Sequence, residues 1–351
     1  MPEWPNGHGS GPCSLVLTGV RILLPALVPS SSSEDGTLSF HISLEKKCGG
    51  FNPPPRIYSR TAILLKKGSS LFYGEFMQQY LDLLKHILEH GSDRVDRTGV
   101  GARSVFGAQM RFNMEDGFPA MTTKQLAWKS VVSELLWFLE GSGDENRLKQ
   151  ILGKQKTIWT ANAQAEYWKP KAKFEGDLGR VYGVQWRSWN GPEGKVDQIA
   201  NVIKLIKENP ASRRIILTAW NPGELHLMAL PPCHMFCQFF VDKDKLSLQM
   251  YQRSCDMFLG VPFNIASYSL LLHLISQVTD TKAHEFIHTL GDAHIYHNHF
   301  DQVREQLRRK PLTLPALRLN PAIKDINKFT MGDIALEKYK HHPPIKGEMA
   351  V

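Results

Sequence analysis

The sequence predicts a soluble protein of the mixed α/β class. Apolar residues recur at helical spacing between residues 76 and 87, which indicates an amphipathic helix. Two runs that alternate apolar and polar residues, 236–241 and 246–251, surround a polar turn and indicate a β-hairpin. The composition, with 42% apolar and 22% charged residues, is that of an ordinary globular protein. At 351 residues the chain can form one large domain or two of ordinary size.

The elements before the hairpin are predicted from local pattern. The apolar run 126–139 is typical of a buried helix that a glycine ends. Residues 158–159 suit a strand, and the Gly- and aromatic-rich stretch 178–187 suits a strand or a loop. Asp197 can cap a helix with an apolar stripe, and a strand follows at residues 215–220.

After the hairpin, residues 265–278 form an apolar run of helical length, and residues 286–290 suit a strand. The tail, residues 342–351, contains two prolines and a glycine and ends in an apolar tip. We expect this tail to be flexible and able to fold over a site.

Residues 1–70 differ in composition from the rest, because Gly, Pro and Ser crowd this segment. The apolar run 15–28 is too short to span a bilayer. Residues 1–11 hold no Lys or Arg, which argues against a secretory signal. We therefore expect a low-complexity, disordered extension at 1–70 and an ordered domain at 71–351.

Charge and cysteine usage limit the class of protein further. The net charge of +8 suits an anionic partner, either nucleic acid or a small ligand, although a mildly basic surface explains it equally well. Neither a zinc site nor a disulfide scaffold is expected from the spacing of the five cysteines. A cytoplasmic location fits best, with mitochondrial and nuclear pools left open. The five are Cys13, Cys48, Cys233, Cys237 and Cys255.

The stretch 229–268 carries the strongest chemical signal. A cysteine thiol, Cys233, is well suited to add to an electron-poor carbon. Arg253 belongs to a polar cluster that follows the hairpin, and a neighbouring Arg favours the thiolate. Asn264, at the start of an apolar helical run, offers an amide that can read the edge of a ring.

Two further positions are candidates with an ordinary alternative beside each. Glu134 lies on a largely apolar helix face, where burial would raise its pKa and make it an acid or base near neutrality. A surface or lysine-paired carboxylate is the alternative. Arg97 lies in the glycine-rich loop 96–101, where it can fork onto a phosphate. A turn with a solvated Arg is the alternative.

Arg213 and Arg214 stand at the start of a predicted strand, where neighbouring side chains point to opposite faces. They can form either a phosphate clamp or an ordinary surface pair. His294 and Tyr296 alternate, so both would lie on one face of an extended segment, as suits hydrogen bonding to sugar hydroxyls. The histidines of the segment 291–299 lack the usual zinc spacing, so no metal is expected.

From about residue 76 to the end, the chain resembles the classical, folate-dependent thymidylate synthases. Nine motifs occur in the order of that family. They are DRTG (96–99), FPAMTTK (118–124), SELLWFL (133–139), GRVYGVQWR (179–187), SRRII (212–216), ALPPCH (229–234), YQRSCD (251–256), PFNIASY (262–268) and GDAHIYHNH (291–299).

The resemblance implies the conversion of dUMP to dTMP. Cys233 would add to C6 of the uracil ring, C5 would attack the methylene of 5,10-methylenetetrahydrofolate, and hydride from tetrahydrofolate would complete the methyl group and leave dihydrofolate. The residues implied in catalysis are Cys233, Glu134, Tyr182 and Asp256. Asn264 would read O4 and N3 of uracil, and His294 and Tyr296 the 3′-hydroxyl. The residues implied in phosphate binding are Arg97, Arg213, Arg214, Arg253 and Ser254.

The resemblance also implies a single α/β domain on a mixed, twisted sheet flanked by helices. The domain would act as a homodimer, with Arg213 and Arg214 supplied by the partner, and would need neither a membrane nor a metal. The positions that match the folate site are Lys124, Ile158, Trp159, Asp256, Leu259, Gly260, Phe263, Ala350 and Val351.

Two positions depart from the family. Thr160 stands where the family often has an acid, and Arg180 where Pro is common. Both lie near the folate side, so one alternative is a dUMP hydroxymethylase, in which water quenches the same intermediate. A distant alternative is an inactive, RNA-binding member of the fold, against which the intact Cys233, Glu134 and Asn264 argue.

Overall fold

A computed structural model describes residues 37–38, 65–66, 77–95 and 99–348. The chain divides into two compact units, Met1–Leu71 and Phe72–Val351. Of the first unit, two short antiparallel strands are described, β1 (Thr37–Leu38) and β2 (Leu65–Lys66). The rest of the extension expected at residues 1–70 lies outside the described residues.

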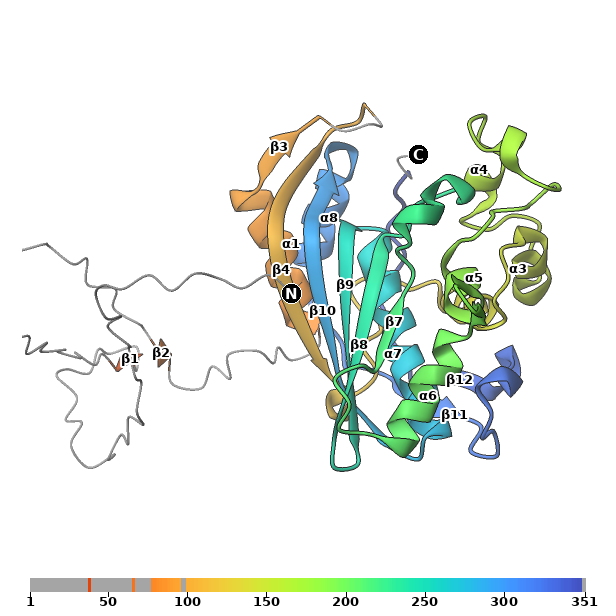
Figure 1. Cartoon of the computed structure of the whole chain (residues 1–351). Helices are drawn as coiled ribbons and strands as arrows, with labels where there is room; N and C mark the ends of the chain where they lie inside the picture. Colours follow the sequence, from red (N-terminus) through yellow and green to blue (C-terminus); the bar gives the residue numbers. More distant parts are fainter. Residues whose placement is uncertain (1–36, 39–64, 67–76, 96–98, 349–351) are drawn as a thin grey trace, which may run out of the picture. The chain divides into compact units, whose positions relative to one another are not determined.

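The second unit is built on a six-stranded sheet with the order β3-β4-β10-β9-β8-β7 (Figure 1). Its neighbouring strands are antiparallel except for β9 and β10, which are parallel. This mixed sheet with its helices confirms the predicted α/β fold class. The strands are β3 (Ser92–Arg94), β4 (Ala102–Asn113), β7 (Ile216–Thr218), β8 (His234–Asp242), β9 (Lys245–Asp256) and β10 (Lys282–Tyr296).

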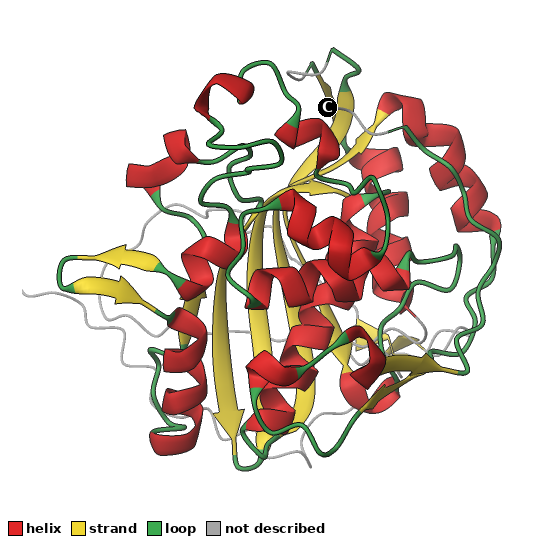
Figure 2. Cartoon of the chain, turned by 90° about the vertical axis from the view of Figure 1, so that its right-hand side faces the viewer, coloured by secondary structure: helices red, strands yellow, loops and turns green. Residues whose placement is uncertain are grey.

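Helix α7 (Gly260–Val278) connects the two parallel strands and forms the centre of the core. It is long and apolar enough to cross a membrane by length and composition, but 83% of its apolar window is buried inside the protein. It is therefore a core helix. Figure 2, viewed from the right-hand side of Figure 1, shows helices in front of the sheet.

The other elements surround this core. The remaining α-helices are α1 (Gln78–His90), α2 (Trp128–Leu139), α3 (Glu145–Leu152), α4 (Thr160–Ala163), α5 (Tyr182–Arg187), α6 (Gln198–Glu208) and α8 (Phe300–Arg308). Two small hairpins pair β5 (Trp189–Gly191) with β6 (Gly194–Val196) and β11 (Ala316–Leu319) with β12 (Ile334–Glu337). Short 3₁₀ helices are η3 (Met114–Asp116), η4 (Lys169–Lys171), η5 (Pro222–Leu227), η6 (His297–His299), η7 (Ile326–Lys328) and η8 (Met331–Asp333).

Most of the predicted elements are confirmed. Helices α1, α2 and α6 and the β8–β9 hairpin lie where the patterns place them, and the Asp197 side chain caps α6 by accepting from the Ala200 amide. Helix α7 begins five residues earlier than predicted, at Gly260. Strand β10 is longer than predicted, because it continues through the polar segment that ends at Tyr296.

Two predictions were wrong. Residues 158–159 form a turn ahead of α4 rather than a strand. Residues 182–187, predicted as strand or loop, form helix α5. Gly183 allows this helix to pack against α2, since a Cβ there would come within 2.5 Å of the Phe138 carbonyl oxygen. A helix this short, fixed by one close backbone contact, has no apolar periodicity from which it could be predicted.

The sheet also has a face that the helices leave partly uncovered. Alternate residues of β8 are exposed, among them Phe236 and Phe240, while the residues between them are buried. Phe106 of β4 is 84% exposed. Arg213 and Arg214 form an exposed turn ahead of β7 and not the start of the strand, so the predicted alternation does not apply to them. Gln238 of β8 donates to the carbonyl of Arg213 at 3.2 Å.

Candidate active site

A cavity of about 1260 Å³ lies at the edge of the sheet where the parallel strands β9 and β10 end. The carboxyl ends of parallel strands are the usual place for a ligand in an α/β fold. Fourteen of the residues singled out in the sequence line it. They are Glu134, Ile158, Trp159, Tyr182, Cys233, Arg253, Ser254, Asp256, Leu259, Gly260, Phe263, Asn264, His294 and Tyr296.

Cys233 lies immediately before β8, and Arg253 of β9 holds the segment that carries it. Arg253 donates to the carbonyls of Pro231 and Pro232 at 3.0 and 2.9 Å, and its Nη2 lies 3.9 Å from the Cys233 Sγ. Burial raises the pKa of the thiol above its usual value, while the charge of Arg253 and a hydrogen bond with Tyr182 oppose the rise. Arg253 therefore lowers the pKa of the thiol, as predicted, but burial raises this pKa by more.

Glu134 lies in the middle of α2 and is 4% exposed. Its Oε1 accepts a hydrogen bond of 2.7 Å from the indole Nε1 of Trp159. Burial raises the pKa of this carboxyl to about 7, and the indole hydrogen bond partly opposes that rise. A carboxyl with this pKa can both hold and release a proton near neutral pH.

Tyr182, the first residue of α5, contacts both Trp159 and Cys233. Its hydroxyl accepts from the backbone amide of Cys233 at 2.7 Å. Its ring lies edge-on to the ring of Trp159, with 5.9 Å between the centroids. Burial raises the pKa of this phenol well above its usual range, so the hydroxyl stays protonated and can donate.

Asn264 lies in the first turns of α7, where its amide is almost fully buried against two side chains that sequence reasoning left without a role. Gln252 donates to its Oδ1 at 3.1 Å, and its Nδ2 is 3.1 Å from the Nε2 of His234. Both residues belong to motifs in the sequence, His234 to ALPPCH and Gln252 to YQRSCD, but no sequence pattern indicates their contact with Asn264.

Asp256, His294 and Tyr296 end the two parallel strands. The Oδ1 of Asp256 accepts from the amides of Phe258 and Leu259 at 3.0 and 3.1 Å, which forms the turn into α7. The rings of His294 and Tyr296 are 5.1 Å apart, as their predicted placement on one face requires.

Asp292, which the sequence reasoning missed, also lines the cavity, and its Oδ1 is 3.2 Å from the Nδ1 of His294. Burial alone would lower the pKa of His294, but the hydrogen bond to Asp292 and the charges of Asp256 and Asp292 raise it overall.

The remaining predicted site residues lie elsewhere. Lys124 is buried under Phe258, donates to its carbonyl and lies 3.6 Å from its ring centroid. Burial lowers the pKa of this ammonium group to about 8. Arg213 and Arg214 are exposed and do not line the cavity. The predictions for Arg97, Ala350 and Val351 fall outside the described residues.

The hydroxyl of Thr160 donates to Glu145, a carboxylate that is 1% exposed. Glu145 also accepts from the hydroxyl of Thr157 at 2.8 Å and pairs with Lys149 at 3.0 Å. The Thr157 hydroxyl in turn accepts from the backbone amide of Trp159 at 3.1 Å. The turn that carries Trp159 is therefore held by a carboxylate from α3.

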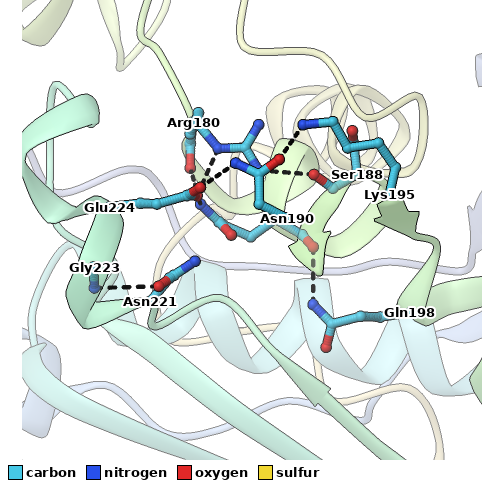
Figure 3. Close-up of polar contacts among 9 residues, drawn as sticks. Arg180, Ser188, Asn190, Lys195, Gln198, Asn221, Gly223 and Glu224 are labelled. Carbon is cyan, nitrogen blue, oxygen red and sulfur yellow. Dashed lines mark hydrogen bonds and ion pairs between the residues drawn. The ribbon is translucent and has the colours of Figure 1, made fainter. Parts of the chain in front are cut away.

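Arg180 does not line the cavity. Its guanidinium bridges the carboxylate of Glu224 at 2.6 Å and the carbonyl of Ser188 at 2.7 Å, and Glu224 also accepts from Asn190 (Figure 3). Gln185 donates to the same carboxylate at 2.7 Å. This cluster ties both ends of α5, and with it Tyr182, to η5.

The described residues contain no group of three or more His, Cys, Asp or Glu side chains that could hold a metal ion. The cavity instead combines the Cys233 thiol, a carboxyl titrating near neutrality (Glu134) and the Asn264 amide with apolar side chains on its wall. This arrangement suits covalent chemistry on a small polar ring.

The model of the thymidylate synthase family matches residues 78–351, well over half of the chain. The protein therefore belongs to the thymidylate synthase family, a family of methyltransferase-type enzymes. The match covers the part of the chain in which the nine motifs were found and confirms the resemblance.

Proposed function

We propose that this protein is a thymidylate synthase that methylates dUMP to dTMP with 5,10-methylenetetrahydrofolate. The observation that carries the proposal is that one cavity brings together the Cys233 thiol, the Asn264 amide and the Glu134 carboxyl. The cavity is also large enough for a nucleotide and a second flat ring system side by side.

Each residue of the site has a role that suits its chemistry. Cys233 is the nucleophile, and the guanidinium of Arg253 favours its thiolate. Glu134 holds or moves the protons that leave and enter at the pyrimidine, because its pKa is about 7. Asn264 orients the base, since one amide can donate to O4 and accept from N3.

The folate co-substrate supplies the one-carbon unit and the hydride when it is bound. Trp159, Leu259 and Phe263 form an apolar part of the cavity wall on which a pterin ring can stack. An apolar wall of this kind excludes water, which favours reduction over hydration of the methylene group on C5.

The proposal extends to a homodimer in the cytoplasm. The partly uncovered sheet face, with Phe106, Phe236 and Phe240 exposed, suits a self-complementary interface. Arg213 and Arg214 border that face and lie outside their own cavity, so a partner protomer can receive them as phosphate ligands.

Product analysis tests the proposal. The protein is incubated with dUMP and methylenetetrahydrofolate, the nucleotide is analysed by mass, and dihydrofolate is followed by absorbance. We expect dTMP and dihydrofolate in equal amounts. Formation of 5-hydroxymethyl-dUMP with tetrahydrofolate would support the hydroxymethylase instead, and no turnover at all would support an inactive member of the fold.

A further inference from the structure

A chain of buried polar side chains leads from the cavity into the core. Gln252 of β9 donates to the Oδ1 of Asn264 at 3.1 Å, and its Oε1 lies 2.9 Å from the Nε2 of His288. His288 lies on β10 and is fully buried. Its other ring nitrogen has no hydrogen-bond partner among the described residues. The histidine thus makes one polar contact there, and that contact is with Gln252.

A backbone carbonyl determines the direction of this chain. The Nε2 of Gln252 also lies 3.0 Å from the carbonyl oxygen of Ser254, which can only accept. The amide nitrogen of Gln252 must therefore face Ser254 and Asn264, and its oxygen must face His288. It follows that His288 donates through an Nε2–H, as a neutral imidazole can. Burial, and then the charge of His234, lower the pKa of His288 to about 3, so the ring is neutral at physiological pH.

The hydrogen-bond chain continues beyond Asn264 to His234. Because its Oδ1 accepts from Gln252, its Nδ2 faces the Nε2 of His234, which must accept. His234 then carries its proton on Nδ1 and donates to the hydroxyl of Tyr268 at 3.0 Å. Burial, and then the charge of Arg253, lower the pKa of His234 to about 3, which agrees with a neutral ring.

The chain leaves Asn264 with one N–H and one oxygen lone pair for a ligand. A donor beside an acceptor matches O4 and N3–H of uracil. The same donor and acceptor do not match cytosine, in which the amino group is a donor and N3 is an acceptor. The orientation of the Asn264 amide therefore determines whether the site favours uracil or cytosine.

We propose that His288 is a positioning residue that acts through Gln252 to hold the Asn264 amide in the orientation that selects uracil over cytosine. This inference rests on the proposed function, and it adds a determinant of specificity that does not itself touch the substrate. Without the imidazole donor, the Gln252 oxygen is buried without a partner, and the two amides can turn to relieve that loss.

Three variants test the inference. His288→Phe keeps a ring of similar size and removes the donor. His288→Gln offers an amide N–H at the position of Nε2 and should restore the hydrogen bond. His273→Phe is the matched control, because His273 is a second, half-buried histidine whose Nε2 has no partner among the described residues. Dissociation constants for dUMP and dCMP are measured by calorimetry on the full-length protein, and kcat/KM for each nucleotide is measured beside them.

We expect His288→Phe to lower the dUMP/dCMP affinity ratio about tenfold, the effect of one mispaired buried polar group. His288→Gln should keep most of the wild-type ratio. His273→Phe should lower the melting temperature without changing the ratio. An unchanged ratio in folded His288→Phe, or an equal loss in His288→Phe and His288→Gln, would overturn the inference.

Neutron diffraction of the wild-type protein gives a test that needs no variant. The inference requires the exchangeable hydrogen on Nε2 of His288 and on Nδ1 of His234, and the opposite placement would overturn it. Failure of the proposed function looks different. In that case wild-type protein binds dUMP in preference to dCMP, the ratio responds to His288 as expected, and neither dTMP nor dihydrofolate forms.

Discussion

Replacing Glu134 by Gln should stabilise the fold above neutral pH while it slows turnover. The carboxyl is buried and its pKa is about 7, against an ordinary value of 4.5. Between these two pH values the folded protein keeps a proton that the unfolded chain has lost, so the free energy of unfolding falls as pH rises. The amide of the Glu134→Gln variant does not titrate, so its free energy of unfolding lacks this decline.

The interval between 4.5 and about 7 corresponds to about 3 kcal/mol at 1.36 kcal/mol per pH unit. The stability difference between Glu134→Gln and the wild type should therefore grow by about 3 kcal/mol from pH 4.5 to 7 and stay constant above. Trp159 can donate to the amide oxygen of Gln as it does to the carboxylate, so this hydrogen bond is preserved. Loss of the acid–base group should lower kcat by at least about 10².

Urea unfolding of both proteins at pH 5, 6, 7 and 8 measures this difference. Glu166→Gln is the control for removal of a charge, because the Glu166 side chain is 89% exposed. A difference between Glu134→Gln and the wild type that stays flat across this range, or that grows toward low pH, would refute the reasoning. It would mean that a water or ligand group compensates the charge of Glu134 in the folded protein.

Three further predictions concern the cavity and its partner. Cys233→Ser should lose nearly all turnover, by several orders of magnitude, yet keep dUMP binding by calorimetry; activity above about a tenth of wild type would exclude this nucleophile. Trp159→Phe removes a hydrogen bond that lowers the pKa of Glu134. The limb of the pH–kcat profile that reports Glu134 should therefore move about 1–2 units to higher pH. An unmoved limb would contradict the pairing of Trp159 with Glu134. Arg214→Glu mixed with Cys233→Ser should recover about a quarter of wild-type activity in hybrid dimers, whereas two inactive proteins that stay inactive when mixed and refolded would oppose a shared site.

The elements with a clear period could be predicted from the sequence, and those fixed by contact could not. Helix α1 and the β8–β9 hairpin follow directly from apolar spacing at 3.6 and 2 residues. Helix α5 depends instead on the close approach of Gly183 to the backbone of α2, which no local pattern reports. The turn that carries Trp159 depends on hydroxyl contacts with a carboxylate from another helix.

The candidate site divides in the same way. The thiol, the carboxyl and the amide could be named from their chemistry and their apolar surroundings, and the raised pKa of Glu134 is confirmed. The side chains that orient them could not be named, because Gln252 and His288 meet only when β9 pairs with β10. The sign of the net effect on the Cys233 thiol also escaped prediction, since it is a balance between burial and Arg253.

The two departures from the family have a common physical explanation. Thr160 and Arg180 each replace a residue of different charge, and each is bonded to a buried or nearly buried carboxylate that comes from elsewhere in the chain. An acid at position 160 would stand against Glu145, and two carboxylates sharing one buried site repel each other. Glu145 thus supplies negative charge where position 160 lacks it, and the turn that holds Trp159 keeps its hydrogen bonds. Trp159 is both part of the wall on which the folate would stack and the hydrogen-bond partner of Glu134. Because Thr160 leaves Trp159 in place, it does not by itself favour water over hydride at the methylene.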